Sequence, residues 1–203
     1  MAAHFTPEYD PWDQRLCVIP DGDLFEAIGS GRASVVTDRV DSFTESGIRT
    51  ATGQDIPADV VVTATGFTLL PFGGISMAVD GLTVEPTEHV TFKGMMLSDV
   101  PNFAFFVGYT NASWTLKVSL LAQHLCQLLT HMDEHGYAVC TPRLPAGGVA
   151  TRPLLDFGAG YVQRSLDALP RQGDQHPWTM SMSYLADERA LRREPVADPA
   201  LEF

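Results

Sequence analysis

An apolar stretch, residues 59–67, has the residue types and spacing that best suit a ligand site. An aspartate opens the stretch, three valines follow, and the run ends at Ala-Thr-Gly. A β-branched run of this kind is typical of a strand buried in a parallel sheet. A terminal glycine lets the backbone turn sharply and approach a flat or charged ligand where a Cβ would collide. The pattern predicts a buried strand over 60–63 that ends at a nucleotide site containing Thr65 and Gly66.

A second candidate site lies at the start of a long predicted helix, residues 114–133. The residues directly before this helix are Asn111, Ala112 and Ser113. The first turn of a helix has unsatisfied N–H groups and a positive dipole end, which suit a negatively charged or hydrogen-bond-accepting ligand. Simple N-capping by Asn111 or Ser113 is a compatible interpretation. The neighbouring aromatic residues, Tyr109 and Trp114, either line a ligand cavity or pack in the core.

Alternating strand and helix patterns indicate an α/β fold that could position both sites. The first part reads as a short helix capped by Asp21, followed by strands at 33–37, 40–43, 47–51 and 60–63, with a hairpin turn at 52–54. The second part reads as strands at 89–92, 95–97 and 103–107, the helix at 114–133 and a further helix at 156–169. The long helix has one apolar face, formed by Leu121, Leu125, Leu128, Leu129 and Met132.

Composition excludes several classes of function. A formal net charge of −12 argues against nucleic acid, because no basic face could displace counterions from phosphates. Three cysteines without Cys-x-x-Cys spacing predict neither a disulfide framework nor a zinc site, and fit a reducing cytoplasm. The long helix carries Lys117 and His124, which argues against a membrane span. His131 and His135 have the spacing of a helical metal pair, but cations at a helix C-terminus explain them better, so no metal site is predicted.

Four segments in this order also resemble a known family. They are Tyr9-Asp10-Pro11-Trp12-Asp13-Gln14-Arg15-Leu16-Cys17, Asp21-Gly22-Asp23-Leu24-Phe25, the stretch 59–67, and Val107-Gly108-Tyr109-Thr110-Asn111-Ala112-Ser113-Trp114-Thr115-Leu116. Over 4–178 the chain resembles the C-terminal portion of class B flavoprotein monooxygenases, specifically Baeyer-Villiger enzymes of the ethionamide-activating type. The resemblance implies a partial two-dinucleotide-binding-domain, Rossmann-like FAD/NAD(P)-binding fold that lacks the N-terminal glycine-loop units.

The resemblance also implies a division of the chain into domains. Residues 1–65 would be the C-terminal part of an NADPH-binding domain, and 66–87 an inter-domain linker. Residues 88–140 would be the C-terminal part of an FAD-binding domain, and 141–203 an extension that wraps over the surface. The cofactors of the complete enzyme would be FAD and NADPH, which this chain alone is not expected to retain.

The activity implied by the resemblance is insertion of one oxygen atom from O2 into a ketone, or oxygenation of a sulfur or nitrogen centre such as a thioether or thioamide, through a flavin peroxide. Arg15 would be catalytic, because a permanently charged guanidinium stabilises anions without losing a proton. Gln14 stands where the family has a lysine that contacts the NADPH phosphate, so the preference between NADPH and NADH stays open. Without the resemblance, a surface ion pair is the better interpretation of Arg15.

The remaining site residues implied by the resemblance are cofactor contacts at Thr65, Gly66, Asn111, Ala112 and Ser113. Two other hypotheses are compatible with the sequence. The chain could be a non-catalytic truncated remnant or interaction module whose exposed sheet edges self-associate or pair with a companion chain. It could also be a small, unrelated α/β ligand-binding domain.

Overall fold

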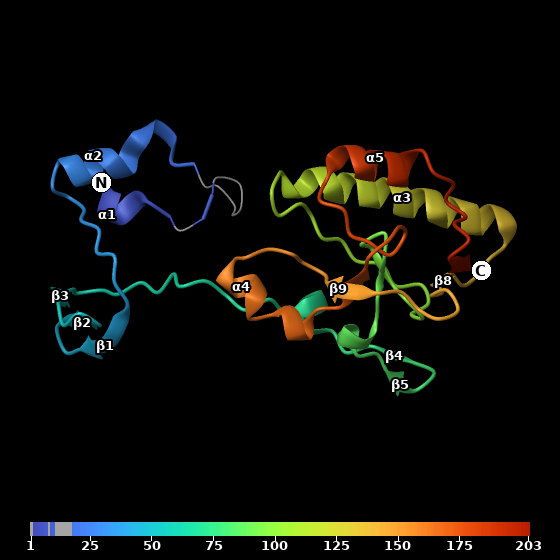
Figure 1. Ribbon diagram of the computed structural model, residues 1–203, viewed down its shortest axis with the longest axis horizontal. Coiled ribbons are helices and arrows are strands. Elements are labelled where there is room, and N and C mark those ends of the chain that lie inside the picture. Colours follow the sequence, from blue (N-terminus) through green and yellow to red (C-terminus); the bar gives the residue numbers. More distant parts are fainter. Residues whose placement is uncertain (1, 8, 11–17) are drawn as a thin grey trace. The chain divides into compact units, whose positions relative to one another are not determined.

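The computed structural model describes residues 2–7, 9–10 and 18–203. The described residues up to Gly66 form one compact unit, and Phe67–Phe203 form a second (Figure 1). The division falls at the start of the predicted linker, residues 66–87. Each unit contains both helices and strands, so the chain has a mixed helix and strand fold.

The first unit combines short helices with a small antiparallel sheet. Its helices are α1 (Ala2–Phe5), the 3-10 helix η1 (Pro20–Gly22) and α2 (Asp23–Gly29). Its sheet has the order β1-β2-β3, with β1 (Val40–Thr44), β2 (Gly47–Thr50) and β3 (Asp55–Pro57). The predicted strand at 40–43 and the hairpin after 47–51 are therefore confirmed, because local turn residues determine both.

Two predictions for the first unit are wrong. Residues 33–37 form no strand, since no neighbouring chain among the described residues pairs with them. Asp21 does not cap the short helix, because its φ is +56° and the helix begins after Gly22, which holds the N-cap position without a side-chain hydrogen bond. An aspartate tolerates this left-handed conformation better than most residues.

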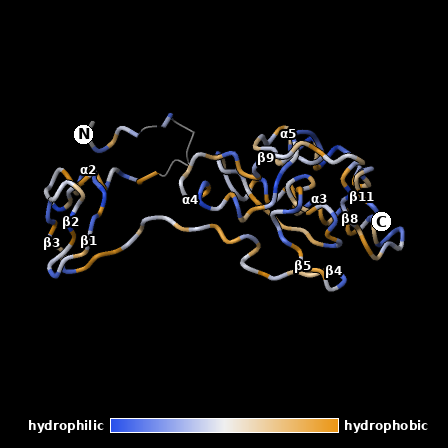
Figure 2. Tube along the Cα trace, turned by 60° about the horizontal axis from the view of Figure 1, so that its bottom comes forward, coloured by the Kyte–Doolittle hydropathy of each residue, from blue (hydrophilic) through white to orange (hydrophobic). Residues whose placement is uncertain are grey.

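The predicted buried strand over 60–63 is also wrong. The stretch is extended but unpaired, and Val60 and Val62 are 78% and 83% exposed. Figure 2 shows it as a hydrophobic trace that leaves β3. A strand of this composition is buried only when neighbouring strands pair with it and helices cover it. Among the described residues, no strand pairs with this stretch.

The second unit is built from short ladders and two main helices. Its strands are β4 (Ala78–Val79), β5 (Leu82–Thr83), β6 (Thr91–Phe92), β7 (Met96–Leu97), β8 (Thr141–Pro142), β9 (Thr151–Pro153), β10 (Arg171–Gly173) and β11 (Leu201–Glu202). Its helices are α3 (Trp114–His135), α4 (Gly160–Gln163) and α5 (Tyr184–Arg192), with 3-10 turns η2 (Pro71–Gly74), η3 (Pro86–Glu88) and η4 (Leu166–Ala168). Isolated bridges join Val90 to Arg171 and Met96 to Ala104. They connect two separate two-stranded sheets, β9-β10 and β6-β7, and the segment around Ala104.

Helix α3 confirms the prediction of a long amphipathic helix and corrects its face. Leu121 and Leu128 are buried in one cluster with residues of the β6–β7 hairpin, while Leu125 is only partly buried. Leu129, predicted to lie on the same face, is 50% exposed. The rotation arises because α5 lies alongside α3 (Figure 1), so the buried face also includes Leu120 and His124.

The C-terminal part of the unit differs from its expected form. The helix predicted over 156–169 is broken into α4 and η4. The strand predicted over 103–107 is reduced to the bridge at Ala104. The segment from Thr141 does more than wrap over the surface, because it supplies core side chains such as Leu154, Val162 and Trp178. These side chains are apolar and buried. The prolines between them interrupt the hydrophobic periodicity that would identify a core segment in the sequence.

Candidate functional site

At the start of helix α3, no side chain of the described residues caps the backbone N–H groups of the first turn. Ser113 is the N-cap in an extended conformation, and it makes no side-chain capping bond to the helix. Its hydroxyl instead lies 3.1 Å from that of Thr115. The first turn contains no acidic residue, and residues 111–113 are exposed. The positive end of the helix can therefore receive a hydrogen-bond acceptor or negative charge from outside.

Close packing of Gly108 against Trp114 determines the path of the chain into this helix. A Cβ built on Gly108 would lie 2.5 Å from ring atoms of Trp114, so only glycine fits there. The contact places the Trp114 ring beside the preceding segment, where 44% of the residue stays exposed. A substitution at Gly108 would displace the helix start or its tryptophan.

A buried polar network fixes the same region from the inside. Asp187 of α5 accepts a 2.6 Å hydrogen bond from the Tyr109 hydroxyl and lies 3.3 Å from the Lys117 ammonium group. Lys117 also donates to the Ser181 carbonyl and lies 5.2 Å from the Tyr109 ring centroid. Burial lowers the pKa of Lys117, although Asp187 opposes this effect. Burial and then the bond to Asp187 raise the pKa of Tyr109. The network ties α5 to both sides of the turn at 110–113.

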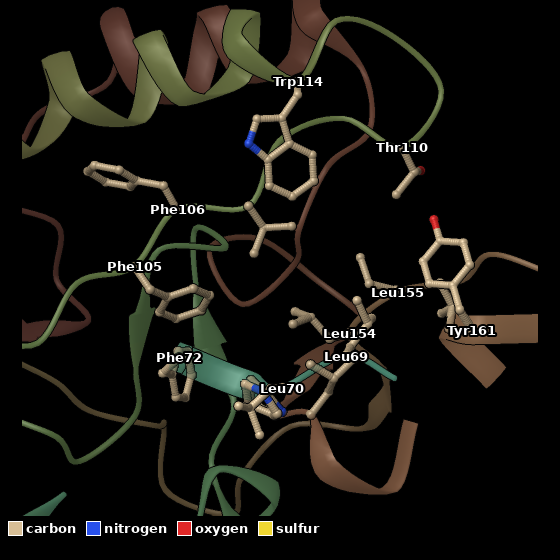
Figure 3. A pocket seen from close by; sticks show the side chains of 15 residues that line it. Leu69, Leu70, Phe72, Phe105, Phe106, Thr110, Trp114, Leu154, Leu155 and Tyr161 are labelled. Carbon is tan, nitrogen blue, oxygen red and sulfur yellow. The ribbon is translucent and has the colours of Figure 1, made fainter. Parts of the chain in front are cut away.

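An apolar cavity of about 290 Å³ lies beside this turn (Figure 3). Its wall includes Thr110 and Trp114 from the start of α3. Phe72 is held edge-on to Phe103 and Phe105, with ring centroids 5.1 and 4.9 Å apart. The other lining residues are Leu69, Leu70, Pro71, Phe105, Phe106, Val107, Leu154, Leu155, Tyr161, Val162, Leu169 and Pro170. The cavity thus adjoins the exposed helix start.

The structure brings together only some of the predicted site residues. Asn111, Ala112 and Ser113 lie together at the helix start, where the Asn111 side chain donates to the Met182 carbonyl at 3.5 Å. Thr65 and Gly66 are exposed in the other unit, and Gly66 has a φ of +98°, a conformation that favours glycine. Gln14 and Arg15 lie outside the described residues.

His131 and His135 lie near the end of α3, and Tyr109 and Trp114 lie near its start. The rings of His131 and His135 are tilted by 39° with centroids 4.1 Å apart, and the described residues contain no group of three metal-ligating side chains. Trp114 lines the cavity, whereas Tyr109 is 1% exposed and belongs to the core.

Sequence reasoning missed Asp187 and the cavity walls from the C-terminal segment. One signal was available for the network: Lys117 and His124 occupy the same helical face as Leu120, Leu121 and Leu128. Polar residues at core positions need buried partners. The identity of those partners, on α5, could not be read from the sequence.

Known proteins match this chain over almost its whole length. The FAD-containing monooxygenase EthA of Mycobacterium tuberculosis (strain ATCC 25618 / H37Rv) is 49% identical over 200 residues, which are 98% of this chain and 41% of EthA. EthA of Mycolicibacterium smegmatis is 45% identical over 200 residues, which are likewise 98% of this chain and 41% of that protein. The chain belongs with the C-terminal portion of FAD-containing monooxygenases.

This monooxygenase-related chain spans about 41% of the length of the curated relatives that it matches. No family model and no solved structure matches it. Among the described residues, no helix is both long and apolar enough to cross a membrane.

Proposed function

We propose that this chain is the C-terminal part of an FAD- and NADPH-dependent monooxygenase that inserts one oxygen atom from O2 into a ketone, or oxygenates a sulfur or nitrogen centre. The observation that carries the proposal is its similarity to EthA along 98% of its length. We also propose that the chain forms part of a Rossmann-like fold. In this fold the first unit would end an NADPH-binding domain, and the second would contribute the last strand and helix of an FAD-binding domain.

The residues at the start of α3 fit a flavin. The donor set is a helix N-terminus with exposed residues at 111–113, no acidic residue in the first turn and no capping side chain among the described residues. Such a terminus suits the carbonyl edge of an isoalloxazine ring, which gains negative charge on reduction. Asn111, Ala112 and Ser113 would hold this edge. The bound flavin would supply the activation of oxygen.

The other predicted residues receive separate roles. Thr65 and Gly66 would allow the backbone to approach the cofactor closely. Arg15 would stabilise negative charge that develops on the substrate oxygen, because guanidinium keeps its charge at any accessible pH. Gln14 would face the region of the nicotinamide cofactor that distinguishes NADPH from NADH. The Tyr109, Lys117 and Asp187 network would hold the turn at 110–113 rigid.

The exposed stretch 59–66 supports dependence on a complementary portion. No residue from 59 to 66 has a backbone hydrogen-bond partner among the described residues. Three valines in such a stretch would be stabilised by addition to a sheet supplied by the rest of the enzyme.

A chimera tests the proposal. This chain would replace the matching 41% of EthA from Mycobacterium tuberculosis. We expect the purified chimera to be yellow from bound FAD, and to convert a ketone with consumption of NADPH and O2. The chain alone, purified in the same way, is expected to be colourless.

The chimera also distinguishes the alternative that the chain is a non-catalytic remnant or interaction module. A folded chimera that stays colourless would contradict the proposal and favour this alternative. A matched variant, Ser113→Pro, removes one backbone donor at the helix start and should weaken FAD binding. The control Ser119→Ala lies on an exposed position of the same helix and should leave it unchanged.

A further inference from the structure

A polar pocket of about 360 Å³ lies in the second unit, between helix α5 and the turn that joins β6 to β7. Strand β9 and the segment 176–181 also contribute to its wall. Among the described residues, this wall shares none with the apolar cavity beside the start of α3. Its polar side chains belong to Lys93, Arg152, His176, Thr179, Ser181 and Asp187. The fold thus gathers three basic side chains from three segments that are distant in sequence.

The ammonium group of Lys93 is held inside the protein. Its side chain is 2% exposed, and its Nζ donates a 3.3 Å hydrogen bond to the Ala190 carbonyl of α5. The carboxylates of Glu194 and Asp198 lie 3.7 and 3.6 Å from Nζ. Both distances are longer than a direct hydrogen bond. Since an ammonium group has three N–H donors, Lys93 can still donate to a further acceptor in the pocket.

The Glu194 carboxylate shows that this part of the pocket suits an oxyanion. Its Oε2 lies 2.9 Å from Nε2 of His176 and 3.7 Å from Nζ of Lys93, so one carboxylate oxygen lies near two basic side chains. Glu194 follows the end of α5, and its side chain is 35% exposed. A glutamate side chain has several accessible rotamers, so it can leave this position to a competing oxyanion.

A buried amide orients Arg152. The guanidinium donates a 3.3 Å hydrogen bond to Oε1 of Gln172, a residue that is 3% exposed. Gln172 is itself fixed, because its side chain also bonds the carbonyls of Pro153 and Leu154 and the amide of Met180. A guanidinium has five N–H donors in a planar fork that matches a carboxylate or a phosphate. The bond to Gln172 uses one of them and holds the group in the wall of the pocket.

The acidic charge near the pocket is partly compensated. Asp187 accepts a 2.6 Å hydrogen bond from Tyr109 and lies 3.3 Å from Lys117, so it repels an anion less than an isolated aspartate would. The chain has a net charge of −12, but repulsion from distant charges is screened beyond about 8 Å at physiological ionic strength. The attraction of an anion therefore depends on Arg152 and on whether Glu194 keeps its place.

We propose that this pocket binds the carboxylate or phosphate group of a small molecule through Arg152, His176 and Lys93, and that Glu194 competes with this group. The hydroxyls of Thr179 and Ser181 can add hydrogen bonds to it. The site goes beyond the proposed oxygenation, because none of residues 110–114 lines the pocket and its occupation requires no flavin.

Titration of the folded chain tests the proposal. The probes are succinate, inorganic phosphate and the uncharged succinamide, measured by calorimetry and by 1H–15N NMR at low ionic strength. We expect at least one of the two oxyanions to bind at least about tenfold more tightly than succinamide, because charge-assisted hydrogen bonds are stronger than neutral ones. The amide signals of Lys93 and of residues 178–181 should shift most. Tighter binding of phosphate than of succinate would identify a phosphate group as the ligand, and the reverse a carboxylate. If neither oxyanion binds more tightly than succinamide, the proposal is wrong.

A pair of arginine variants locates the site. Arg152→Gln should weaken oxyanion binding at least about tenfold, as expected for the loss of hydrogen bonds to a charged group. The matched control is Arg143→Gln, which removes the same charge from exposed ion pairs with Asp99 and Glu202 and should leave binding unchanged. Circular dichroism checks that each variant folds. Equal losses in the two variants would mean that the oxyanion follows net charge and not this pocket, and would overturn the proposal.

A second pair of variants tests the competition by Glu194 and leaves Arg152 in place. Glu194→Gln removes the carboxylate near His176 and Lys93, so oxyanion binding should become about two- to fivefold tighter. Glu188→Gln removes the same charge from an exposed ion pair with Arg193 and should have little effect. Unchanged or weaker binding in Glu194→Gln would show that the oxyanion does not bind beside Lys93 and His176.

Discussion

The Tyr109 hydroxyl donates a 2.6 Å hydrogen bond to Asp187, a residue 78 positions further along the chain. The same carboxylate lies 3.3 Å from the buried Lys117 ammonium group, so one side chain of α5 holds both the segment before α3 and its first turns. Because residues 111–113 lie between these two contacts, the candidate flavin contact is fixed by an interaction distant in sequence.

Asp187→Asn should therefore destabilise the chain strongly. The substitution leaves the Lys117 charge buried without its counter-ion, which costs about 3–5 kcal/mol in comparable cases. The matched control is Glu188→Gln, one residue further along α5, which removes an exposed ion pair with Arg193 at 2.9 Å. Exposed pairs contribute about 0–1 kcal/mol. Urea unfolding of the two variants measures the difference, and similar losses would show that the buried pair has no special role.

The burial of the leucines of α3 predicts how much stability each would lose on truncation to alanine. Leu121→Ala should lower the free energy of unfolding by about 2–5 kcal/mol, because Leu121 is fully buried. Leu129→Ala should change it by at most about 0.5 kcal/mol, since this residue is half exposed. Leu125→Ala should fall between them, as the side chain is partly buried. A large loss at Leu129 and a small loss at Leu121 would mean that the helix is rotated relative to the described packing.

The burial of His124 predicts that the stability of the chain depends on pH. Its Nδ1 lies 2.9 Å from the Leu191 carbonyl, and its buried Nε2 has no hydrogen-bond partner among the described residues. Burial is the main cause that lowers the pKa of His124 below its usual 6.5; Lys93 lowers it further, while the Leu191 bond, Asp198 and Glu194 oppose the shift. Below about pH 6.5 the unfolded chain binds a proton that the folded chain resists, so stability should fall as the pH decreases.

Thermal or urea unfolding between pH 5 and 8 measures this effect. The contribution of His124 to the slope is at most about 1.4 kcal/mol per pH unit. His124→Leu should flatten the fall toward pH 5, while the two proteins should differ little in slope near pH 8. A variant with the parental slope at low pH would show that other groups cause the dependence.

How much the sequence predicts depends on how local the determinants are. The hairpin from β2 to β3 was predicted because its turn residues, Thr52 and Gly53, act locally. Helix α3 was predicted because its periodicity extends over 22 residues. The strand at 60–63 was not correctly predicted, because its burial depends on neighbours and not on its own valines.

The candidate flavin site, too, could be predicted from the sequence only where its determinants are local. Asn111, Ala112 and Ser113 could be placed at a helix start from local pattern alone. The Asp187 contact and the cavity wall at Leu155 join segments that are distant in sequence. Their Pro-rich surroundings carry no regular periodicity that would have indicated a core.

The unpaired stretch 59–66 makes a prediction for hydrogen exchange. In the chain alone its amides should exchange rapidly, because none has a backbone partner among the described residues, whereas amides of β2 should be protected. In the chimera with EthA, the same amides should become slow if the stretch joins a sheet. Exchange measured by mass spectrometry compares the two proteins. Slow exchange in the chain alone would show that the stretch is already paired.

The last prediction concerns Arg15 and uses the chimera. If the guanidinium stabilises negative charge on the substrate oxygen, Arg15→Ala should slow ketone oxygenation by about two to three orders of magnitude. Flavin reduction by NADPH should stay largely intact, because hydride transfer precedes the charge that Arg15 would stabilise. Arg15→Lys should restore little activity, since a point charge lacks the planar fork of donors. Stopped-flow absorbance follows flavin reduction, and product analysis follows oxygenation. Oxygenation at the parental rate in Arg15→Ala would make Arg15 a surface ion-pair residue and remove the segment 9–17 from the proposed active site.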